Sequence, residues 1–414
     1  MKIALALLTA FALPIFAQEE KDDTPYDQIK TLAKAMQMIR QDYVDEKKIS
    51  YEQLTRAALR GMLQSLDPHS QYMEPQNFED MKEDTESRFG GLGIHVTERN
   101  GDLIIVSPME DSPAFRAGLM PGDQIIKVNG ASAEKMTIAE TTEKLRGPKG
   151  TRITLTILRP GTKEIKDFEM VREEIKVWSV KEAKMLPAEM TGESKIGYAR
   201  ITQFNAPTAE ELAKKLDELE KQGMQGFVLD LRFNPGGLIN SAVDIAGMFL
   251  PRGTVVATTE GRVPSQSRKY IANSTLNRRS NYPLAVLINY GSASGSELAA
   301  GALKDTNRAI IVGETSFGKG SVQSILPVGD GSALRLTTAK YYTPSHTLIH
   351  EHGITPTIRA TMTPEQERQL MIQRREDLPD DQRKKDLANF RDTQLERAVD
   401  ALKGVLVYAQ KTGN

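Results

Sequence analysis

The sequence predicts an α/β protein with a separate β-rich module and helical segments at both ends. Short apolar runs alternate with helical patterns between residues 195 and 360, which favours a core built on a partly parallel sheet. Residues 85–175 instead combine alternating apolar positions with turn dipeptides, as a small β module does. The predicted organisation is therefore a helical region 18–84, a β module 85–175, an α/β core 176–360 and a charged helical region 361–414.

The first region carries a helical stripe. Ile29, Leu32, Met36, Ile39 and Tyr43 recur every three or four residues, which places them on one helix face. A second predicted helix starts near Tyr51 and ends before Pro68. The stripe either packs on the protein's own core or meets a partner helix, in which case a homodimer forms through the terminal helices.

The β module is predicted from its apolar runs and glycines. Leu103–Val106 and Ile153–Arg159 are typical strands, and Pro121-Gly122 marks a turn between them. The glycine-rich segment Phe89–Ile94 opens the module.

Three buried strands are predicted in the α/β core, at Gly226–Arg232, Leu284–Asn289 and Ala309–Gly313. A helix from Glu297 to Lys304 follows the second of them. After a charge-rich stretch, apolar residues recur at helical spacing from Leu395 to Leu406 and predict a final amphipathic helix.

Residues 1–17 have the pattern of a secretory signal peptide. A short positive start precedes an apolar run, Ile3–Ala17, that is interrupted by Pro14 and is too short to span a bilayer. We expect cleavage after Ala17 and export to the periplasm. If the segment is retained, the protein is membrane-associated.

The composition limits the chemistry and the partners. Lys and Arg number 54 against 55 Asp and Glu, so the net charge of −1 argues against bulk electrostatic binding of nucleic acid. Cysteine is absent, which excludes disulfides, thiol nucleophiles and cysteine metal sites. A nucleophile must therefore come from Ser, Thr, Lys or a carboxylate, and no cofactor is expected.

Two small-residue loops follow predicted strands. The turn Gly291–Glu297 leads into a helix, whose free N–H groups suit an oxyanion, although helix capping by serine explains the same pattern. The loop Ser316–Gln323 carries Lys319 between two glycines. A lysine that is desolvated beside a serine becomes a general base, because burial lowers its pKa.

The histidines offer no competing chemistry. The chain has five, and none lies in a glycine loop at a strand end, so a Ser-His-Asp triad lacks a base. His346, His350 and His352 with Glu351 match no strong zinc spacing, and a solvated polar loop is expected there instead of a metal site.

Several motifs then occur in a familiar order. The most specific is Val286–Gln323, and others are Asp230-Leu231-Arg232, Asn234-Pro235-Gly236-Gly237, Ser65–Ser70 and Thr338–Pro344. With these motifs the sequence resembles the carboxy-terminal processing peptidases, serine endopeptidases with an embedded PDZ domain, from about Ile29 to Leu406. The resemblance implies a crotonase-like (ClpP/crotonase) catalytic core with the β module as an inserted PDZ domain.

The resemblance also implies residue roles. The nucleophile falls on Ser294, the base on Lys319, and the residue that orients the lysine on Gln323. The oxyanion donors fall on the N–H of Gly295 and on that of Gly236 or Gly237. Gly295 departs from the family's usual alanine, and two later departures, at His346-Thr347 and Thr357, concern the edge of the core.

For the PDZ domain, the resemblance places the carboxylate-binding loop at Gly90, Gly91, Leu92 and Gly93, beside Ile94. Partners would be protein or peptide substrates bound by their C-terminal carboxylates, with an adaptor in some cases, and peptide binding would gate the protease. Two alternatives are a non-catalytic PDZ scaffold on a protease-like fold and an active protease whose PDZ domain only tethers a partner.

Overall fold

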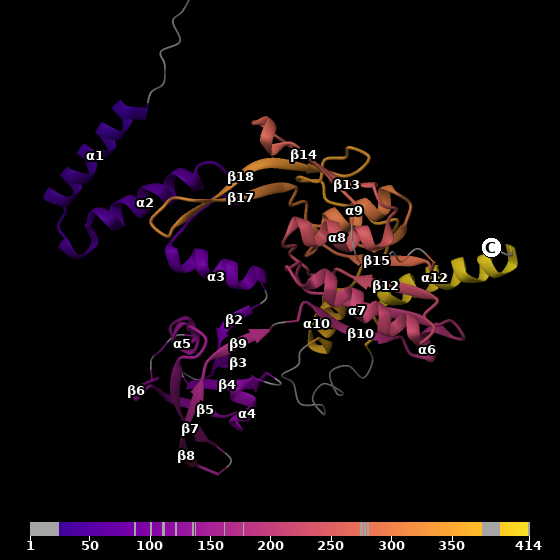
Figure 1. The fold of residues 1–414 in the computed structure, drawn as a ribbon, viewed down its shortest axis with the longest axis horizontal. Coiled ribbons are helices and arrows are strands. Elements are labelled where there is room, and N and C mark those ends of the chain that lie inside the picture. The colour runs from indigo at the N-terminus through magenta and orange to yellow at the C-terminus, as the bar shows by residue number, and fades with distance from the viewer. Residues whose placement is uncertain are drawn as a thin grey trace, which may run out of the picture. The chain divides into compact units, whose positions relative to one another are not determined.

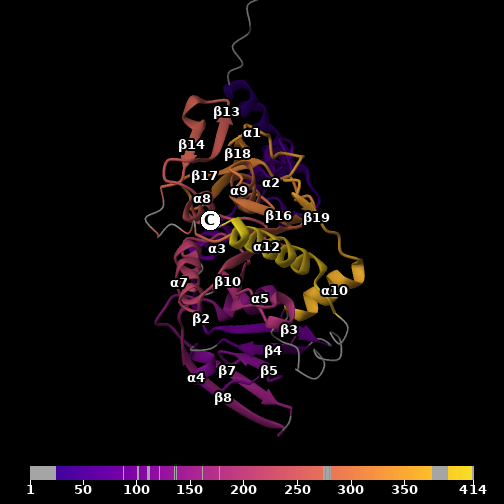
Figure 2. The same cartoon turned by 90° about the vertical axis from the view of Figure 1, so that its right-hand side faces the viewer.

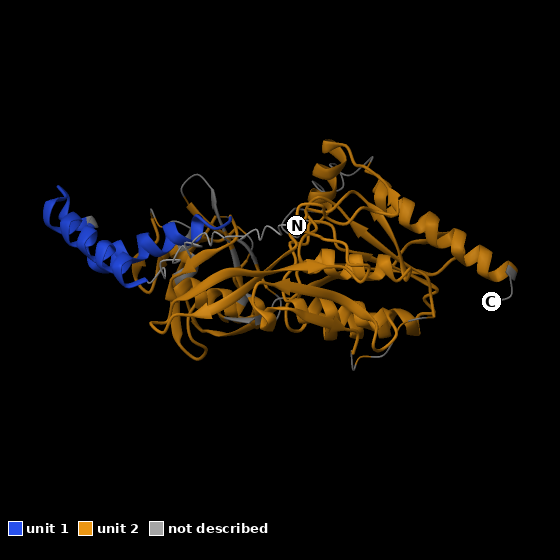
Figure 3. Cartoon of the chain, turned by 90° about the horizontal axis from the view of Figure 1, so that it is seen from above, with its two compact units in different colours: residues 1–67 blue, residues 68–414 orange. Residues whose placement is uncertain are grey.

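The computed structural model describes residues 25–412, except 87, 100–101, 110–111, 121, 135, 137, 161, 177, 274–275, 277–278, 280 and 375–389. The expected signal peptide thus lies outside the described residues. The chain divides into two compact units, residues 1–67 and 68–414 (Figure 3). No helix of the described part has the length and apolar character needed to cross a bilayer.

The first unit is helical. It contains α1 (Pro25–Asp42), a 3-10 turn η1 (Glu46–Lys48) and α2 (Tyr51–Gln64). Ser50 caps α2, since its hydroxyl accepts from the N–H of Gln53 at 3.1 Å and the Gln53 side chain accepts from the N–H of Ser50 at 3.4 Å. Helix α1 buries none of its residues. The predicted apolar stripe of α1 therefore does not belong to a core of the described chain.

A six-stranded, mostly parallel sheet forms the centre of the second unit. Its strands in spatial order are β10 (Val180–Met185), β11 (Ile196–Ile201), β12 (Gly226–Asp230), β15 (Leu284–Ile288), β16 (Ala309–Gly313) and β19 (Ile358–Arg359). All neighbouring pairs are parallel except β10 with β11. The parallel core and its three central strands, predicted from apolar runs, are confirmed.

Helices cover both faces of this sheet (Figures 1 and 2). Phe227 and Leu229 of β12 join a core cluster with α7 (Thr208–Lys221), α8 (Ile239–Phe249) and α9 (Gly295–Asp305). Val228, between them on the strand, faces the other side and packs in a second cluster with α12 (Thr393–Thr412). Burial on both faces explains why these strands read as continuous apolar runs.

A second, antiparallel sheet packs on α8 and α9 and was not predicted. Its strands are β1 (Gln71–Met73), β18 (Ala333–Tyr342), β13 (Val255–Gly261) and β14 (Arg268–Ile271), with β17 (Ser321–Pro327) also paired to β18. Outside the β module, the second unit also contains α3 (Pro75–Glu86), α6 (Ala188–Thr191), η2 (Pro264–Gln266) and α10 (Pro364–Gln373). Because β1 precedes the β module and the other strands follow it, the sheet joins segments that local patterns cannot connect.

The β module has its own sheet and core. Its strands are β3 (Ile94–Arg99), β4 (Asp102–Pro108), β5 (Gln124–Val128), β6 (Ala131–Ser132), β7 (Arg152–Arg159) and β8 (Glu164–Val171), and its helices are α4 (Pro113–Arg116) and α5 (Ile138–Leu145). Strand β3 ends the order β3-β4-β5-β7-β8 and lies near α5. A two-stranded ribbon, β2 (Arg88–Gly91) with β9 (Glu173–Lys176), precedes and follows the module in the chain.

Candidate active site

The turn between β15 and α9 presents one serine with a free hydroxyl. Ser292 and Ser296 are fully buried, and their hydroxyls donate to the carbonyls of Leu231 at 2.8 Å and Asn234 at 2.9 Å. Ser294 lies between them, is only partly buried, and its Oγ has no hydrogen-bond partner among the described residues. The two flanking serines thus fix the turn, and Ser294 remains available for chemistry.

The backbone at Ser294 is strained. Its φ of 51° and ψ of −110° place a residue with a side chain in a region that favours glycine. Further hydrogen bonds hold the turn in this conformation. Asn289, which follows β15, accepts through Oδ1 from the N–H groups of Phe233 at 2.9 Å and Gly291 at 3.1 Å. Such a turn lifts the serine side chain out of the strand-to-helix junction and into the cavity described below.

Glu297, in the first turn of α9, joins the turn that contains Ser294 to the loop that contains Lys319. Its Oε2 accepts from the N–H groups of Ser294 at 2.8 Å and Lys319 at 2.9 Å. Its Oε1 accepts from the Ser316 hydroxyl and the Gly318 N–H, both at 2.6 Å. The side chain is fully buried, and burial raises the pKa of Glu297 while these hydrogen bonds oppose that shift. The sequence analysis did not assign Glu297 a role.

Lys319 reaches the same site from the loop between β16 and β17. Burial lowers the pKa of Lys319 below its ordinary value, the charge of Arg335 lowers it further, and the charge of Glu297 acts in the opposite direction. No hydrogen bond joins Lys319 Nζ to Ser294 Oγ or to any other described group. A partly desolvated amine with a depressed pKa is the chemical requirement for a lysine base.

Gln323 lies on β17, beyond the lysine. Its Nε2 donates to the hydroxyls of Thr337 at 2.8 Å and Ser321 at 3.3 Å. Its Oε1 is buried and has no donor among the described residues. The structure therefore brings Gln323 into the site but pairs its amide with β18 and not with Lys319.

These groups line one cavity of about 540 Å³. It lies where β12 and β15 end, which is where parallel α/β sheets commonly bind ligands, and the second sheet forms its other wall. Ser294, Lys319 and Gln323 all line it, and its other lining residues include Gly236, Gly237, Arg268, Arg335 and Tyr341.

The loop after β12 approaches the serine closely. A Cβ on Gly236 would lie 2.7 Å from Ser294 Cβ, and one on Gly237 would lie 2.1 Å from the carbonyl oxygen of Phe204, so glycine is required at both positions. The N–H of Gly236 already donates to Asn234 Oδ1 at 2.9 Å. By contrast, the N–H groups of Gly237 and Gly295 have no acceptor among the described residues. Of the predicted oxyanion donors, the N–H of Gly236 is thus already hydrogen-bonded within the protein.

A buried charge network lies beneath this loop. The Asp230 carboxylate accepts from Arg232, from Arg374 at 2.7 Å and from the Tyr198 hydroxyl at 2.8 Å. Arg232 is fully buried and makes two hydrogen bonds to Asp392, at 2.7 and 2.8 Å. Asp392 directly precedes α12, so the C-terminal segment fixes the strand end that leads to Gly236 and Gly237.

The glycine segment of the β module differs in part from the prediction. Gly90 and Gly91 lie in β2, opposite Glu174 and Glu173, so they belong to the ribbon and not to an open loop. The turn itself is Leu92-Gly93, which precedes Ile94 at the start of β3. A Cβ on Gly93, at φ 70°, would lie 2.3 Å from Ser112 Cβ, so only glycine fits there.

The groups of this turn point to an anion site. The carbonyls of Leu92 and Gly93 accept from the N–H groups of Ala114 at 3.0 Å and Met109 at 2.8 Å. The N–H groups of Leu92 and Gly93 have no acceptor within the described residues. Open donors beside an unpaired sheet edge suit a peptide carboxylate.

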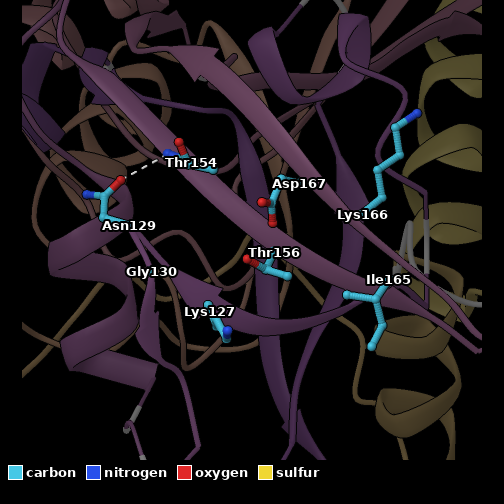
Figure 4. Close-up of a pocket in the computed structure, with 8 residues that line it drawn as sticks. All are labelled: Lys127, Asn129, Gly130, Thr154, Thr156, Ile165, Lys166 and Asp167. Atoms are coloured by element: carbon cyan, nitrogen blue, oxygen red, sulfur yellow. Dashed lines mark hydrogen bonds between the residues drawn. The ribbon is translucent and has the colours of Figure 1, made fainter.

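A further hollow on the β module carries none of the predicted site residues. It is lined by Lys127, Asn129, Gly130, Thr154, Thr156, Ile165, Lys166 and Asp167 on β5, β7, β8 and the turn after β5 (Figure 4). Asn129 Oδ1 accepts from the Thr154 N–H at 2.9 Å. Its lining residues belong to the sheet of the β module, and none of them lines the cavity that contains Ser294 and Lys319.

The histidine-rich loop has ordinary partners. His346 Nε2 lies 2.8 Å from Glu260 Oε1, and its ring stacks on Tyr342 with centroids 4.5 Å apart. In the described part of the chain, no three His, Cys, Asp or Glu side chains are grouped as metal ligands.

Comparison with known families agrees with this arrangement. Residues 195–360 match the model of peptidase family S41, residues 104–159 match a PDZ domain, and residues 12–77 match the activating protease CtpB N-terminal domain. The α/β core and the β module are thus an S41 peptidase fold, of the ClpP/crotonase type, with a PDZ insert.

The relatives extend over most of the chain. A carboxy-terminal-processing protease of Bartonella bacilliformis is 42% identical over 360 residues, which cover 85% of this chain and 79% of the relative. The carboxy-terminal processing protease CtpB of Bacillus subtilis is 40% identical over 349 residues, covering 84% and 70%. A putative S41 protease from Bacteroides fragilis shares the fold, with a TM-score of 0.50, 18% identity and coverage of 89% and 97%. The chain therefore belongs to the carboxy-terminal processing proteases, serine peptidases of family S41 that carry a PDZ domain.

Proposed function

We propose that this protein is an exported endopeptidase that recognises protein substrates by their C-termini and cleaves them with Ser294 and Lys319. The observation that carries the proposal is the pairing of a free, strained serine with a half-buried lysine of lowered pKa in one cavity. Glu297 supports this pairing because it holds both loops.

In the proposed reaction, neutral Lys319 takes the proton of the Ser294 hydroxyl as Oγ attacks the scissile carbonyl. The N–H groups of Gly237 and Gly295 stabilise the oxyanion, and such donors are worth about 2.7–4 kcal/mol each in other enzymes. The Lys319 ammonium then protonates the leaving amine, which leaves an acyl-enzyme on Ser294. Lys319 next activates the water that releases the acyl group.

Gln323 is proposed to orient the lysine. Its buried Oε1 lacks a donor, and an unsatisfied buried acceptor costs about 1–3 kcal/mol. Lys319 lines the same cavity, and its amine also lacks a hydrogen-bond partner among the described residues. A hydrogen bond between them would satisfy both groups and direct the lysine lone pair toward Ser294.

Substrate recognition is proposed for the PDZ domain. The open N–H groups of Leu92 and Gly93 would bind the terminal carboxylate, while the peptide adds a strand to the edge of β3. Peptide binding would also gate the protease, by favouring an arrangement in which Ser294 Oγ and Lys319 Nζ are hydrogen-bonded. The catalytic cavity and this loop carry separate parts of the proposal and can be tested separately.

Export and assembly are further parts of the proposal. The apolar pattern of residues 1–17 supports export to the periplasm, with membrane association if the segment is retained. The exposed apolar residues of α1, among them Ile29 and Ile39, support pairing with a second copy. An adaptor would supply substrates that the PDZ domain does not bind alone.

The test uses an unfolded reporter protein and a peptide that the enzyme does not cut. Wild-type protein should cleave the reporter and Ser294→Ala protein should not. The peptide with a free C-terminal carboxylate should accelerate cleavage, whereas its C-terminal amide should act about ten- to a hundredfold more weakly, because a charge-assisted hydrogen bond is lost. No cleavage by wild-type protein would overturn the catalytic proposal. Equal effects of acid and amide would overturn only C-terminal recognition.

A further inference from the structure

A row of hydroxyl groups leads from strand β1 to Gln323. Ser70, directly before β1, donates to Thr337 Oγ1 at 3.4 Å and accepts from the Thr337 N–H at 3.2 Å. Thr337 Oγ1 in turn accepts from Gln323 Nε2 at 2.8 Å. Three residues that are far apart in sequence, in the Ser65–Ser70 motif, on β18 and on β17, thus form one connected set.

This row determines how the Gln323 amide is oriented. The NH2 group is satisfied by two hydroxyl oxygens, those of Thr337 and Ser321. The carbonyl oxygen Oε1 is consequently left buried and unpaired. If the amide rotated by 180°, its NH2 group would face the lysine, and two donors would meet.

Ser70 is well placed to hold Thr337. It is 3% exposed, and its hydroxyl contacts both the backbone N–H and the side-chain oxygen of Thr337. The pairing of β1 with β18 places Gln71 opposite Arg335, two residues before Thr337. The Ser65–Ser70 motif has no part in the proposed chemistry, and this contact gives its last residue a function.

We propose that Thr337, supported by Ser70, is a positioning residue that holds the Gln323 amide with its carbonyl oxygen directed to the catalytic lysine. This inference rests on the proposed function, because it assigns Thr337 and Ser70 to the same catalytic site. Neither residue takes part in bond making. Their effect on the rate passes through Gln323 and Lys319.

The test compares three substitutions on β18. Thr337→Val removes the hydroxyl and keeps the shape, and Thr337→Ser keeps the hydroxyl. Thr338→Val is the matched control, since Thr338 Oγ1 pairs with the Ser324 hydroxyl at 2.7 Å and not with Gln323. For each variant, kcat, KM and the melting temperature are measured with the unfolded reporter, alongside wild-type and Ser294→Ala protein.

Thr337→Val should lower kcat by about two- to tenfold, the loss expected for one hydrogen bond between neutral groups, and should leave KM nearly unchanged. Thr337→Ser should restore most of kcat, and Thr338→Val should have wild-type kcat even if both valine variants melt at the same temperature. Ser70→Ala should show a smaller loss of kcat than Thr337→Val.

The pH profile provides a second readout. The charged groups that act on Lys319 are Arg335 of β18 and Glu297 of α9, and the substitution leaves both in place. A displaced ascending limb in Thr337→Val that returns to its wild-type position in Thr337→Ser therefore reports the orientation of Gln323. Equal kcat in wild-type and Thr337→Val protein, or equal losses in the two valine variants, would overturn this inference. Absence of cleavage by wild-type protein would overturn the proposed function instead.

Discussion

Ser294 and Lys319 are joined through a single oxygen atom, because the backbone N–H groups of both donate to Oε2 of Glu297, at 2.8 and 2.9 Å. The serine begins α9 and the lysine precedes β17, so their loops come from different parts of the core. A buried carboxylate with four donors fixes the distance between these two backbones. The preorganisation of the catalytic pair thus depends on a residue that need not contact the substrate.

Glu297→Gln should reduce kcat strongly. The amide keeps one acceptor oxygen but presents an NH2 group to two of the four donors, and each hydrogen bond to a charged group is worth about 1.5–3 kcal/mol. We expect a loss of at least tenfold in kcat and a lower melting temperature, measured by reporter cleavage and thermal unfolding. Glu365→Gln, at an exposed ion pair on α10, is the control and should change neither. Wild-type kcat in Glu297→Gln would show that the shared carboxylate does not position the pair.

Substitutions of the three serines in the turn between β15 and α9 should differ in their effects on cleavage and on the melting temperature. Ser294→Ala should abolish cleavage and leave the melting temperature unchanged, since its Oγ has no partner in the described chain. Ser292→Ala and Ser296→Ala should retain cleavage but unfold at lower temperature, because each removes a buried hydrogen bond worth about 0.5–1.5 kcal/mol. Cleavage by Ser294→Ala protein, with none by Ser292→Ala or Ser296→Ala protein, would show that Ser294 is not the nucleophile.

The rate should rise with pH as Lys319 loses its proton. Burial, followed by the charge of Arg335, lowers the pKa of Lys319, so a larger fraction is neutral at a given pH than for a free lysine. Arg335→Gln removes the second of these effects. The pKa of Lys319 should then rise, and the ascending limb of kcat/KM against pH should move to higher pH.

Arg268→Gln is the matched control for that experiment. Arg268 lines the same cavity but is not among the groups that act on the Lys319 pKa. Its pH profile should keep the wild-type limb. An ascending limb that stays in place in Arg335→Gln, or a profile of wild-type protein that is flat where chemistry limits the rate, would argue against Lys319 as the base.

Much of the core could be predicted from sequence, because its strands are buried on both faces and its helices begin at recognisable turns. The runs at Leu284 and Ala309 gave strands β15 and β16 close to their observed bounds. The strand runs are local signals. Ser294 and Lys319 could be assigned through the family resemblance, since helix capping alone also explains the small-residue turn at Ser294.

The rest depends on pairing between distant segments. Strand β1 is three residues long and pairs with β18 at a separation of more than 260 residues, which no local pattern reveals. Gly90 and Gly91 read as an open loop, yet their pairing with β9 places them in a ribbon. Glu297 resembles an ordinary capping residue, and only the arrival of the Lys319 loop in space shows its second role.

The buried arginine beneath the oxyanion loop gives the last prediction. The Arg232 side chain has no exposed surface and is neutralised by Asp230 at the end of β12 and by Asp392 before α12. Removing one partner of a buried ion pair costs about 3–5 kcal/mol, so Asp392→Asn should lower the stability markedly. It should also lower kcat, because Arg232 lies at the start of the loop that contains Gly236 and Gly237. Asp400→Asn, at an exposed position of α12, should change neither quantity.

The same network sets the response to acid. Burial alone would raise the pKa of the Asp230 carboxyl, but Arg232 and Arg374 lower it well below its ordinary value. Its contribution to stability is therefore present above the unfolded pKa of about 3.9 and is lost as the pH falls below it. Asp392→Asn weakens the hold on Arg232, so the variant should unfold at a higher pH than wild-type protein in an acid titration followed by circular dichroism. Identical acid unfolding of the two proteins, with equal kcat at neutral pH, would show that the C-terminal segment does not support the oxyanion loop.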